Sequence, residues 1–382
     1  MKSNQTLKTI GIIAISLFIL YTITPAYLKM TIVHLFPGIE DYKIFKNRIV
    51  ATGTVSPWQN AHDFMQYKIT DQERDTLEHY KSVAYLIIQH DSIVYEEYWD
   101  NFNQHTLSNS FSVAKSVVGL LIGCAIDDGY IQSIDQAVGD FIPEFKIPPN
   151  NKLTIRHLLT MSSGLNWNES YDNPFSMTTK AYYGNAINKL VLDLKVIETP
   201  GKEFHYKSGN TQLLSIILKK ATKKSLSDYA SEKLWIPLGA ENEALWSLDK
   251  TNGDEKAYCC LNSNARDFAR LGKLILKDGH IKKKQLISKK YLQKSITAAN
   301  YLTDHEDHKP VDFYGYQWWI INHEGENIPY ARGIYGQYIF ALKKHDAIVV
   351  RLGHKRSKSK INHHPSEIYS YLSTAKRILK QR

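Results

Sequence analysis

An apolar stretch in the first third of the chain runs from Val117 to Ile126, where only two glycines and a cysteine interrupt the aliphatic residues. A helix that is apolar on every side is a buried helix. Gly129, just after the stretch, is a suitable C-terminal stop for such a helix. The pattern therefore predicts a buried core helix whose first turn contains Ser112.

Strand patterns occur near both ends of the chain. Residues 82–88 and 93–98 are rich in β-branched and aromatic side chains, and the turn at 90–92 predicts that they form a hairpin. Strand-like runs return at 330–342 and 347–352. Strands at both ends with helices between them predict a single discontinuous domain, built on one sheet assembled from the two ends of the chain.

Helical spacing of apolar residues accounts for much of the remaining chain. It predicts helices at residues 71–79, 153–160, 180–194, 211–220 and 265–277. A last helix is expected to begin with Pro365 in its first turn, and its apolar stripe consists of Ile368, Tyr371, Leu372, Ala375, Ile378 and Leu379. The predicted fold class is α/β of the α+β type: an antiparallel sheet built from both chain ends, flanked by helices and carrying a helical insert.

The N-terminus has the pattern of a targeting or anchoring segment. Lys2 and Lys8 precede residues 9–28, in which only hydroxyl residues, a proline and tyrosines interrupt the apolar run. About 20 such residues suffice to cross a bilayer. The alternative is a signal peptide that is removed on secretion, for which Thr24-Pro25-Ala26 is a mediocre cleavage site.

We therefore expect three parts along the chain. These are an uncleaved signal anchor over residues 1–28, a juxtamembrane lead-in over 29–80 and a large domain over 81–382. The domain should lie in the periplasm or on the extracellular side.

Composition and charge narrow the function classes. The chain has 382 residues, of which 43% are hydrophobic and 23% charged, which is typical of a globular protein with an ample core. Its formal net charge of +10 comes from scattered lysines without interleaved aromatic residues. This pattern favours an anionic membrane surface or cell-wall polymer over nucleic acid, and no nucleic-acid partner is expected. The oligomeric state is left open.

Neither a disulfide nor a metal centre is expected from the sequence. Cys124 lies in the predicted core helix, and Cys259 and Cys260 are adjacent, which makes a bond between them improbable. Residues 305–308 (His-Glu-Asp-His) offer ligand-type side chains, but their spacing fits a charged loop better than a zinc motif. We expect no cofactor.

The candidate nucleophile is Ser112, with Lys115 three residues later. Residues at i and i+3 share one face of a helix, so the lysine amine can lie beside the serine hydroxyl and take or relay its proton. The helix N-terminus favours negative charge that develops on the oxygen. The alternative is an ordinary N-cap serine and a lysine that reaches out to solvent. The same spacing occurs in polar or surface contexts at Ser247/Lys250, Ser357/Lys360 and Ser373/Lys376.

A second candidate is Tyr206, which lies in a polar loop beside Lys207. Nearby ammonium groups lower a phenol pKa, so a tyrosinate there would be a competent general base. The alternative is a tyrosine that serves only in packing.

A third feature is the pair of glycines in residues 331–337, expected on the penultimate strand. Glycines weaken a strand interior unless something must approach the backbone closely. Backbone N–H groups on such an edge can hold a carbonyl oxygen as it becomes an oxyanion. The alternative is a bulge.

Together these features resemble the serine β-lactamase and penicillin-binding-protein superfamily. The pattern is most similar to the class C-like serine hydrolases, the branch of the esterases and 6-aminohexanoate-dimer hydrolase. The resemblance covers roughly residues 80 to 355. It is carried by Ser112-Val113-Ala114-Lys115, Tyr206-Lys207-Ser208 and Ala331-Arg332-Gly333, with supporting stretches at 153–165, 237–239 and 314–319.

The resemblance implies a β-lactamase-like fold whose helical insert carries part of the active site. It implies that Ser112 is the nucleophile, Lys115 its proton partner and Tyr206 the acid/base. The N–H groups of Ser112 and Ile334 would form the oxyanion hole. Substrate-binding positions would be Ser208, Asn210, Arg332, Gly333 and Tyr335.

Two departures from the family pattern bear on the substrate. Ser208 replaces the amide side chain that usually follows the tyrosine by two residues, and Ala331 replaces the lysine or histidine of the third element. Those family side chains help to hold the carboxylate of penicillins and D-alanyl peptides, so their loss argues against efficient β-lactamase activity. Arg332 is an alternative carboxylate partner.

The predicted function is an exported, membrane-tethered serine hydrolase that cleaves an ester or amide through an acyl-enzyme. One alternative is a D-alanyl-D-alanine carboxypeptidase or β-lactamase. An alternative from another class is a sensor with little or no catalytic activity that binds cell-wall peptides.

Overall fold

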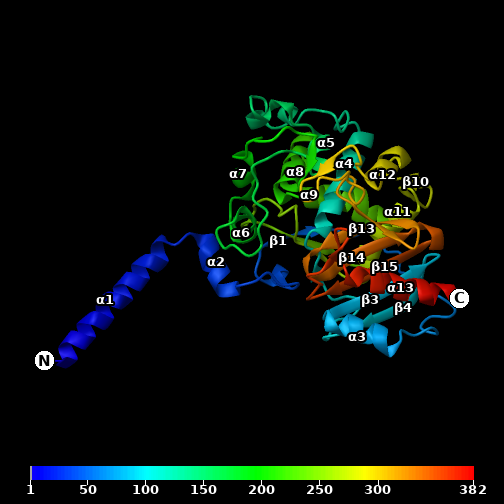
Figure 1. Ribbon diagram of the computed structural model, residues 1–382, viewed down its shortest axis with the longest axis horizontal. Helices are drawn as coiled ribbons and strands as arrows, with labels where there is room; N and C mark the ends of the chain where they lie inside the picture. The colour runs from blue at the N-terminus through cyan, green and yellow to red at the C-terminus, as the bar shows by residue number, and fades with distance from the viewer. Residues whose placement is uncertain (1) are drawn as a thin grey trace.

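The computed structural model describes residues 2–382, with the side chains of residues 2–8, 17, 19 and 20 left aside. The predicted anchor begins at Met1, which lies outside the described residues. Figure 1 shows α1 (Lys2–Ile23) projecting away from the body of the molecule, and α2 (Ala26–His34) lying against it.

A membrane span can be assessed from the length and apolar composition of these two helices. Within residues 2–382, no helix taken singly satisfies both criteria. The segments Thr9–Ile23 and Ala26–His34 satisfy them only as a pair, with a bend of 111° between them.

The main sheet has seven strands, contributed by both ends of the chain. Its order is β12-β13-β14-β15-β3-β4-β2, and neighbouring strands are antiparallel except for the parallel pair β2 and β4. The strands are β2 (Gln59–Asn60), β3 (Ser82–Gln89), β4 (Ser92–Tyr98), β12 (Trp319–His323), β13 (Glu326–Gly333), β14 (Gln337–Leu342) and β15 (Ala347–Gly353). The predicted fold class and the 82–98 hairpin are confirmed.

Helices cover both faces of this sheet (Figure 1). On one face α11 (Ala265–Leu276) packs against β14 and β15. A Cβ atom at Gly272 would lie 2.7 Å from the Ile348 side chain, so glycine allows this close approach. On the other face lies α13 (Glu367–Lys380), where the Tyr85 hydroxyl donates a hydrogen bond to the Tyr371 carbonyl at 2.7 Å.

A smaller sheet of four strands holds the start of the core helix. Its order is β1-β7-β8-β5, from β1 (Asn47–Val50), β7 (Ala244–Ser247), β8 (Leu261–Ser263) and β5 (Ser108–Asn109). The core helix α4 (Val113–Asp127) follows β5 directly, and its residues from Val113 to Ala125 are buried, as predicted. The lead-in over residues 29–80 contributes β1, β2 and α3 (Asp71–His79) to the folded body.

The other elements surround these layers. The helices are α5 (Ile155–Leu159), α6 (Met177–Tyr183), α7 (Ile187–Leu192), α8 (Ser208–Thr222), α9 (Leu226–Ala230), α10 (Ile236–Leu238) and α12 (Lys289–Ser295). The short strands are β6 (Glu203–Phe204), β9 (His280–Ile281), β10 (Lys284–Gln285), β11 (Thr303–Asp304), β16 (Lys360–Ile361) and β17 (His364–Pro365).

Three element predictions are wrong in detail. The strand expected over 330–342 is the end of β13 and all of β14, because Tyr335 (φ 61°) and Gly336 (φ 83°) reverse the chain between them. The helix expected over 180–194 is divided into α6 and α7, because Gly184 is extended (φ −83°, ψ 173°). Pro365 pairs in β17 instead of opening the last helix, which begins at Glu367.

Candidate active site

Ser112 lies at the junction between β5 and α4. The residue before it, Phe111, has φ 44°, a left-handed conformation that is uncommon for a bulky side chain and that turns the chain sharply into the helix. Ser112 occupies the N-cap position, yet its side chain makes no capping hydrogen bond. The hydroxyl is therefore available for other chemistry, and the ordinary N-cap interpretation does not hold.

Lys115 points inward to Ser112. Its Nζ lies 3.0 Å from Ser112 Oγ and 2.9 Å from the carbonyl oxygen of Tyr258. The side chain is 1% exposed, which excludes a lysine that reaches out to solvent. Burial lowers the pKa of Lys115 to about 8, partly opposed by the negative charge of Glu169. A substantial share of Lys115 is therefore neutral near pH 8.

Tyr206 comes between β6 and α8 and faces the same pair. Lys115 Nζ lies 5.1 Å from the centre of its ring, and its hydroxyl interacts with the Ser112 side chain. Burial raises the pKa of Tyr206 well above its usual value, although the interaction with Ser112 opposes the shift. The expectation of a tyrosinate held by lysine ammonium groups is therefore wrong, because desolvation outweighs the nearby positive charge. The direction of this pKa shift favours the neutral phenol over the tyrosinate.

The two residues predicted to supply the oxyanion-hole N–H groups, Ser112 and Ile334, lie at one pocket. Gly333 ends β13 so close to the preceding chain that a Cβ atom there would lie 2.3 Å from the Ser110 carbonyl oxygen. Ile334 and Ser112 consequently line the same pocket. Within the described part of the chain, neither the Ser112 N–H nor the Ile334 N–H donates a hydrogen bond to another group. The glycine is explained by this close approach, and not by a bulge.

Ser208 is held by a carboxylate that sequence reasoning missed. Glu169 accepts hydrogen bonds from the backbone N–H of Ser208 at 2.6 Å and from its hydroxyl at 2.7 Å. The same carboxylate accepts the Trp167 indole N–H at 2.6 Å and the Tyr171 hydroxyl at 2.5 Å. A glutamate in a polar loop carries no sequence signal of this role, because its partners are distant side chains and backbone groups.

The remaining predicted binding residues are mostly engaged elsewhere. Asn210 is fully buried, where its amide accepts from Ser163 at 2.7 Å and faces the Met161 sulfur. The Arg332 guanidinium stacks on the Trp319 ring at 3.2 Å and donates to a backbone carbonyl at 2.9 Å. The Tyr335 ring packs edge-on against Phe111 at 5.5 Å. Of the five positions, Ser208 lines the pocket and Gly333 shapes its edge.

A pocket of about 250 Å³ adjoins Ser112. Its inner side consists of Phe111, Ser208, Tyr258, Cys259 and Ile334. Its outer side comes from three segments: the end of α2 through Pro37, the loop at 171–174 and helix α6.

Cys259 and Cys260, beside this pocket, form a disulfide bond with each other. The sequence-based expectation that they do not pair is therefore wrong. The chain turns at Cys260 (φ 68°), and the backbone carbonyl just before the pair, that of Tyr258, accepts the Lys115 hydrogen bond. Cys124 is a buried free thiol.

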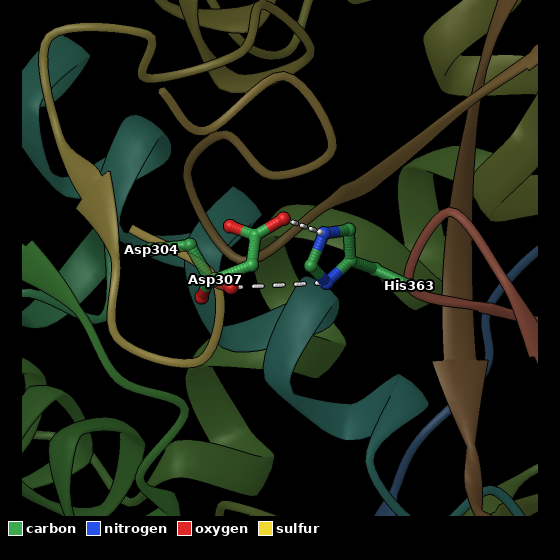
Figure 2. Close-up of side chains that lie close together, drawn as sticks. All are labelled: Asp304, Asp307 and His363. Carbon is green, nitrogen blue, oxygen red and sulfur yellow. Dashed lines mark ion pairs between the residues drawn. The ribbon is translucent and has the colours of Figure 1, made fainter. Parts of the chain in front are cut away.

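One group of side chains has the composition of a metal site. Asp304, Asp307 and His363 bring potential ligand atoms within 4.8 Å of one another (Figure 2). The imidazole directs Nδ1 to Asp304 at 3.9 Å and Nε2 to Asp307 at 3.6 Å. Each carboxylate thus lies nearest to a different ring nitrogen, at a distance longer than a hydrogen bond. His305 does not join the group and stacks on His205 at 4.3 Å.

Comparisons with known proteins agree with this geometry. The family model described as Beta-lactamase matches residues 69–365. The chain is 26% identical to the 6-aminohexanoate-dimer hydrolase of Paenarthrobacter ureafaciens over 305 residues. The alignment covers 76% of each of the two chains.

Solved structures show the same fold. A putative 6-aminohexanoate-dimer hydrolase from Bacillus anthracis superposes with a TM-score of 0.77 at 22% identity, over 90% of this chain and 92% of the other. A family VIII carboxylesterase superposes with a TM-score of 0.63 at 16% identity, over 84% of this chain and 98% of the other. Because the family model covers most of the chain, this protein belongs to the beta-lactamase family and is a serine hydrolase of that fold.

Proposed function

We propose that this protein is an exported, membrane-tethered hydrolase that cleaves an ester or amide through an acyl-enzyme on Ser112. The observation that carries the proposal is the buried Lys115 amine, which lies 3.0 Å from Ser112 Oγ with its pKa lowered to about 8. A lysine of ordinary pKa would hold its proton at neutral pH and could not accept another. Burial converts Lys115 into a usable base.

Acylation begins with proton transfer from Ser112 to the neutral Lys115 amine. In that form the amine keeps one N–H on the Tyr258 carbonyl, and its lone pair faces the Ser112 hydroxyl. As Ser112 Oγ bonds to the substrate carbonyl carbon, negative charge develops on the carbonyl oxygen. The N–H groups of Ser112 and Ile334, together with the N-terminus of α4, would stabilise that charge.

Tyr206 acts as the acid in this scheme. Its raised pKa keeps the phenol protonated, and its interaction with the Ser112 side chain places it near the reacting oxygen. The phenol proton goes to the departing alcohol or amine as the bond to the carbonyl carbon breaks, and Lys115 returns a proton to the phenolate. Deacylation runs the steps in reverse, with water in place of the leaving group.

Two positions that hold a substrate carboxylate in the family are not free to do so here. The Glu169 carboxylate occupies both hydrogen-bond donors of Ser208, where family members use an amide to hold a substrate carboxylate. Arg332 is engaged with Trp319, and Ala331 supplies no cation. We therefore expect uncharged esters or amides to be better substrates than penicillins or D-alanyl peptides. The carboxylesterase among the structural relatives fits this expectation.

Covalent labelling tests the proposal directly. The purified full-length protein should react with a fluorophosphonate probe, and peptide mass spectrometry should place the adduct on Ser112. Ser112→Ala should abolish labelling. Ser357→Ala is the matched control, because Ser357 begins another Ser-x-x-Lys sequence and should leave labelling unchanged. Full labelling of Ser112→Ala would contradict the acyl-enzyme, and no labelling of the natural protein would favour the passive sensor.

Cell fractionation tests the proposed location. The apolar residues of α1 and the positive charges before them support an uncleaved anchor. We expect full-length protein in the membrane fraction, with its folded domain digested by protease added outside the cytoplasmic membrane. Recovery of the intact chain from the cytoplasm alone would contradict both the anchor and the export.

A further inference from the structure

The outer wall of the pocket beside Ser112 is built by the segment that follows the N-terminal helix. Thr31, Leu35, Phe36 and Pro37 all line the pocket that contains Ser112. Leu35 and Phe36 are 67% and 72% exposed, so they extend the apolar lining out to the molecular surface. The N-terminal segment is thus part of the site and not only a tether.

Specific contacts hold this segment in place. Helix α2 packs on α6, and the His34 ring stacks on the Tyr183 ring at 6.3 Å. Just beyond the wall, Asp41 accepts hydrogen bonds from the Gly38 N–H at 2.9 Å and from the Tyr182 hydroxyl at 2.7 Å. Tyr182 and Tyr183 of α6 themselves line the pocket. The contacts therefore join the N-terminal segment to α6 on the outer side of the pocket.

The size and chemistry of the pocket define what fits in it. Its volume is about 250 Å³, whereas an apolar cavity of about 150 Å³ is enough to bind benzene. Aromatic and aliphatic side chains dominate its outer surface, apart from Asp172, Thr31 and the two threonines of α6. The pocket opens directly at the nucleophile, so the group it receives is attached to the carbonyl that Ser112 attacks or to its leaving group.

We propose that this pocket binds the acyl chain of an amphipathic ester or amide, and that Leu35 and Phe36 determine the preferred chain length. The inference rests on the proposed function, since it assigns a substrate class to the same nucleophile. The chain enters between the N-terminal segment and α6, with the carbonyl at Ser112 and the polar leaving group outside the pocket.

The test measures kcat/KM of the full-length protein for p-nitrophenyl acetate, butyrate, hexanoate and octanoate. Each methylene that becomes buried should raise kcat/KM about fourfold. The ratio of octanoate to acetate should therefore exceed about tenfold in the natural protein. In Leu35→Ser/Phe36→Ser this ratio should fall at least about fivefold, because the outer methylenes lose their apolar wall.

Helix α2, which precedes Leu35 and Phe36, offers a matched control. Ile32 and Val33 are 69% and 72% exposed but do not line the pocket, so Ile32→Ser/Val33→Ser should keep the natural ratio. Circular dichroism melting checks that both double variants are folded, which their exposure favours.

Three results would overturn the proposal. These are acetate turnover with no gain on chain lengthening, an unchanged ratio in the Leu35/Phe36 variant, or an equal fall in both variants. Absence of all ester hydrolysis together with absence of fluorophosphonate labelling would instead overturn the proposed function, and this inference with it.

Discussion

The two sides of the pocket differ in how they are built. On the inner side, Lys115 is 1% exposed, and its amine, the half-buried Ser112 hydroxyl and the Tyr258 carbonyl form one hydrogen-bonded group. On the outer side, Leu35 and Phe36 belong to a surface segment and keep about two thirds or more of their side chains in solvent.

We infer from this difference that the inner side determines the rate of the reaction and the outer side determines which substrates are preferred. Burial on the inner side lowers the pKa of Lys115 and raises that of Tyr206, which in the proposed mechanism would prepare a base and an acid beside the Ser112 hydroxyl. Leu35 and Phe36 on the outer side carry no charge or polar group, so they contribute apolar contact. Changes on the inner side should therefore affect rate by orders of magnitude, and changes on the outer side should affect substrate preference.

The largest effect is expected for Ser112→Ala. Removing the nucleophile of a coupled catalytic set typically costs about 10⁶-fold in kcat. Ester hydrolysis by this variant should fall to background, while its melting temperature stays near that of the natural protein. Ser357→Ala should retain the natural rate. Residual turnover above about a tenth of normal would show that the inner side does not supply the nucleophile.

Lys115→Met should come next, with a loss of about 10³-fold or more in kcat. Its Tm should not fall at neutral pH, because a fully buried cation that lacks a carboxylate partner is replaced by an apolar side chain.

The control for this variant is Lys376→Met, in which a second buried lysine of a Ser-x-x-Lys sequence is replaced. Lys376 lies 3.5 Å from buried Glu326 and donates to the His323 carbonyl. Losing it should lower Tm and leave kcat nearly unchanged. The distinction between the two lysines would be contradicted if Lys115→Met lowered Tm and kept kcat while Lys376→Met lowered kcat and kept Tm.

Tyr206→Phe should lower kcat by about 10²–10⁴-fold, the usual cost of losing a general acid or base. The ring and its packing against Trp319 are retained, so Tm should change little. Tyr314→Phe is the control, because Tyr314 is a buried neighbour whose ring centre lies 6.1 Å from that of Tyr206. A near-normal rate in Tyr206→Phe would remove this residue from the mechanism and leave Lys115 as the sole proton-transfer group.

The pH dependence of kcat/KM should reveal Lys115 directly. Only the neutral amine accepts the Ser112 proton, so kcat/KM should rise about tenfold per pH unit below the Lys115 pKa. The curve should level off above pH about 8. Glu169 raises this pKa, so Glu169→Gln should move the midpoint to lower pH. A flat profile between pH 6 and 9 would contradict a lysine base.

The smallest effect is expected just outside the outer wall. Phe175 follows Pro174 and is 65% exposed, but it does not line the pocket. Phe175→Ser should leave kcat/KM within about twofold and Tm unchanged, as is usual for surface substitutions. A large loss of kcat/KM for octanoate esters alone would show that Phe175 also belongs to the outer side of the pocket.

Local patterns predicted most of the elements and failed where the chain changes direction. The hairpin of β3 and β4 and the buried helix α4 follow from periodicity within single segments. The reversal at Tyr335 was not predictable, because tyrosine rarely adopts φ 61° and only the surrounding sheet holds it there. The disulfide of Cys259 and Cys260 likewise depends on a local turn that the residue types do not reveal.

The sequence by itself determined the fold class and the pairing of Ser112 with Lys115, because a spacing of three on a buried helix places both side chains on one face. Only the tertiary structure decided the directions in which the pKa values of Lys115 and Tyr206 shift. The pKa of a lysine or tyrosine depends on desolvation by residues distant in sequence, and here burial lowers that of Lys115 and raises that of Tyr206. The tertiary structure also decided that Glu169 accepts the hydrogen bonds of Ser208 and that the N-terminal segment lines the pocket. Both follow from contacts between elements far apart in the chain.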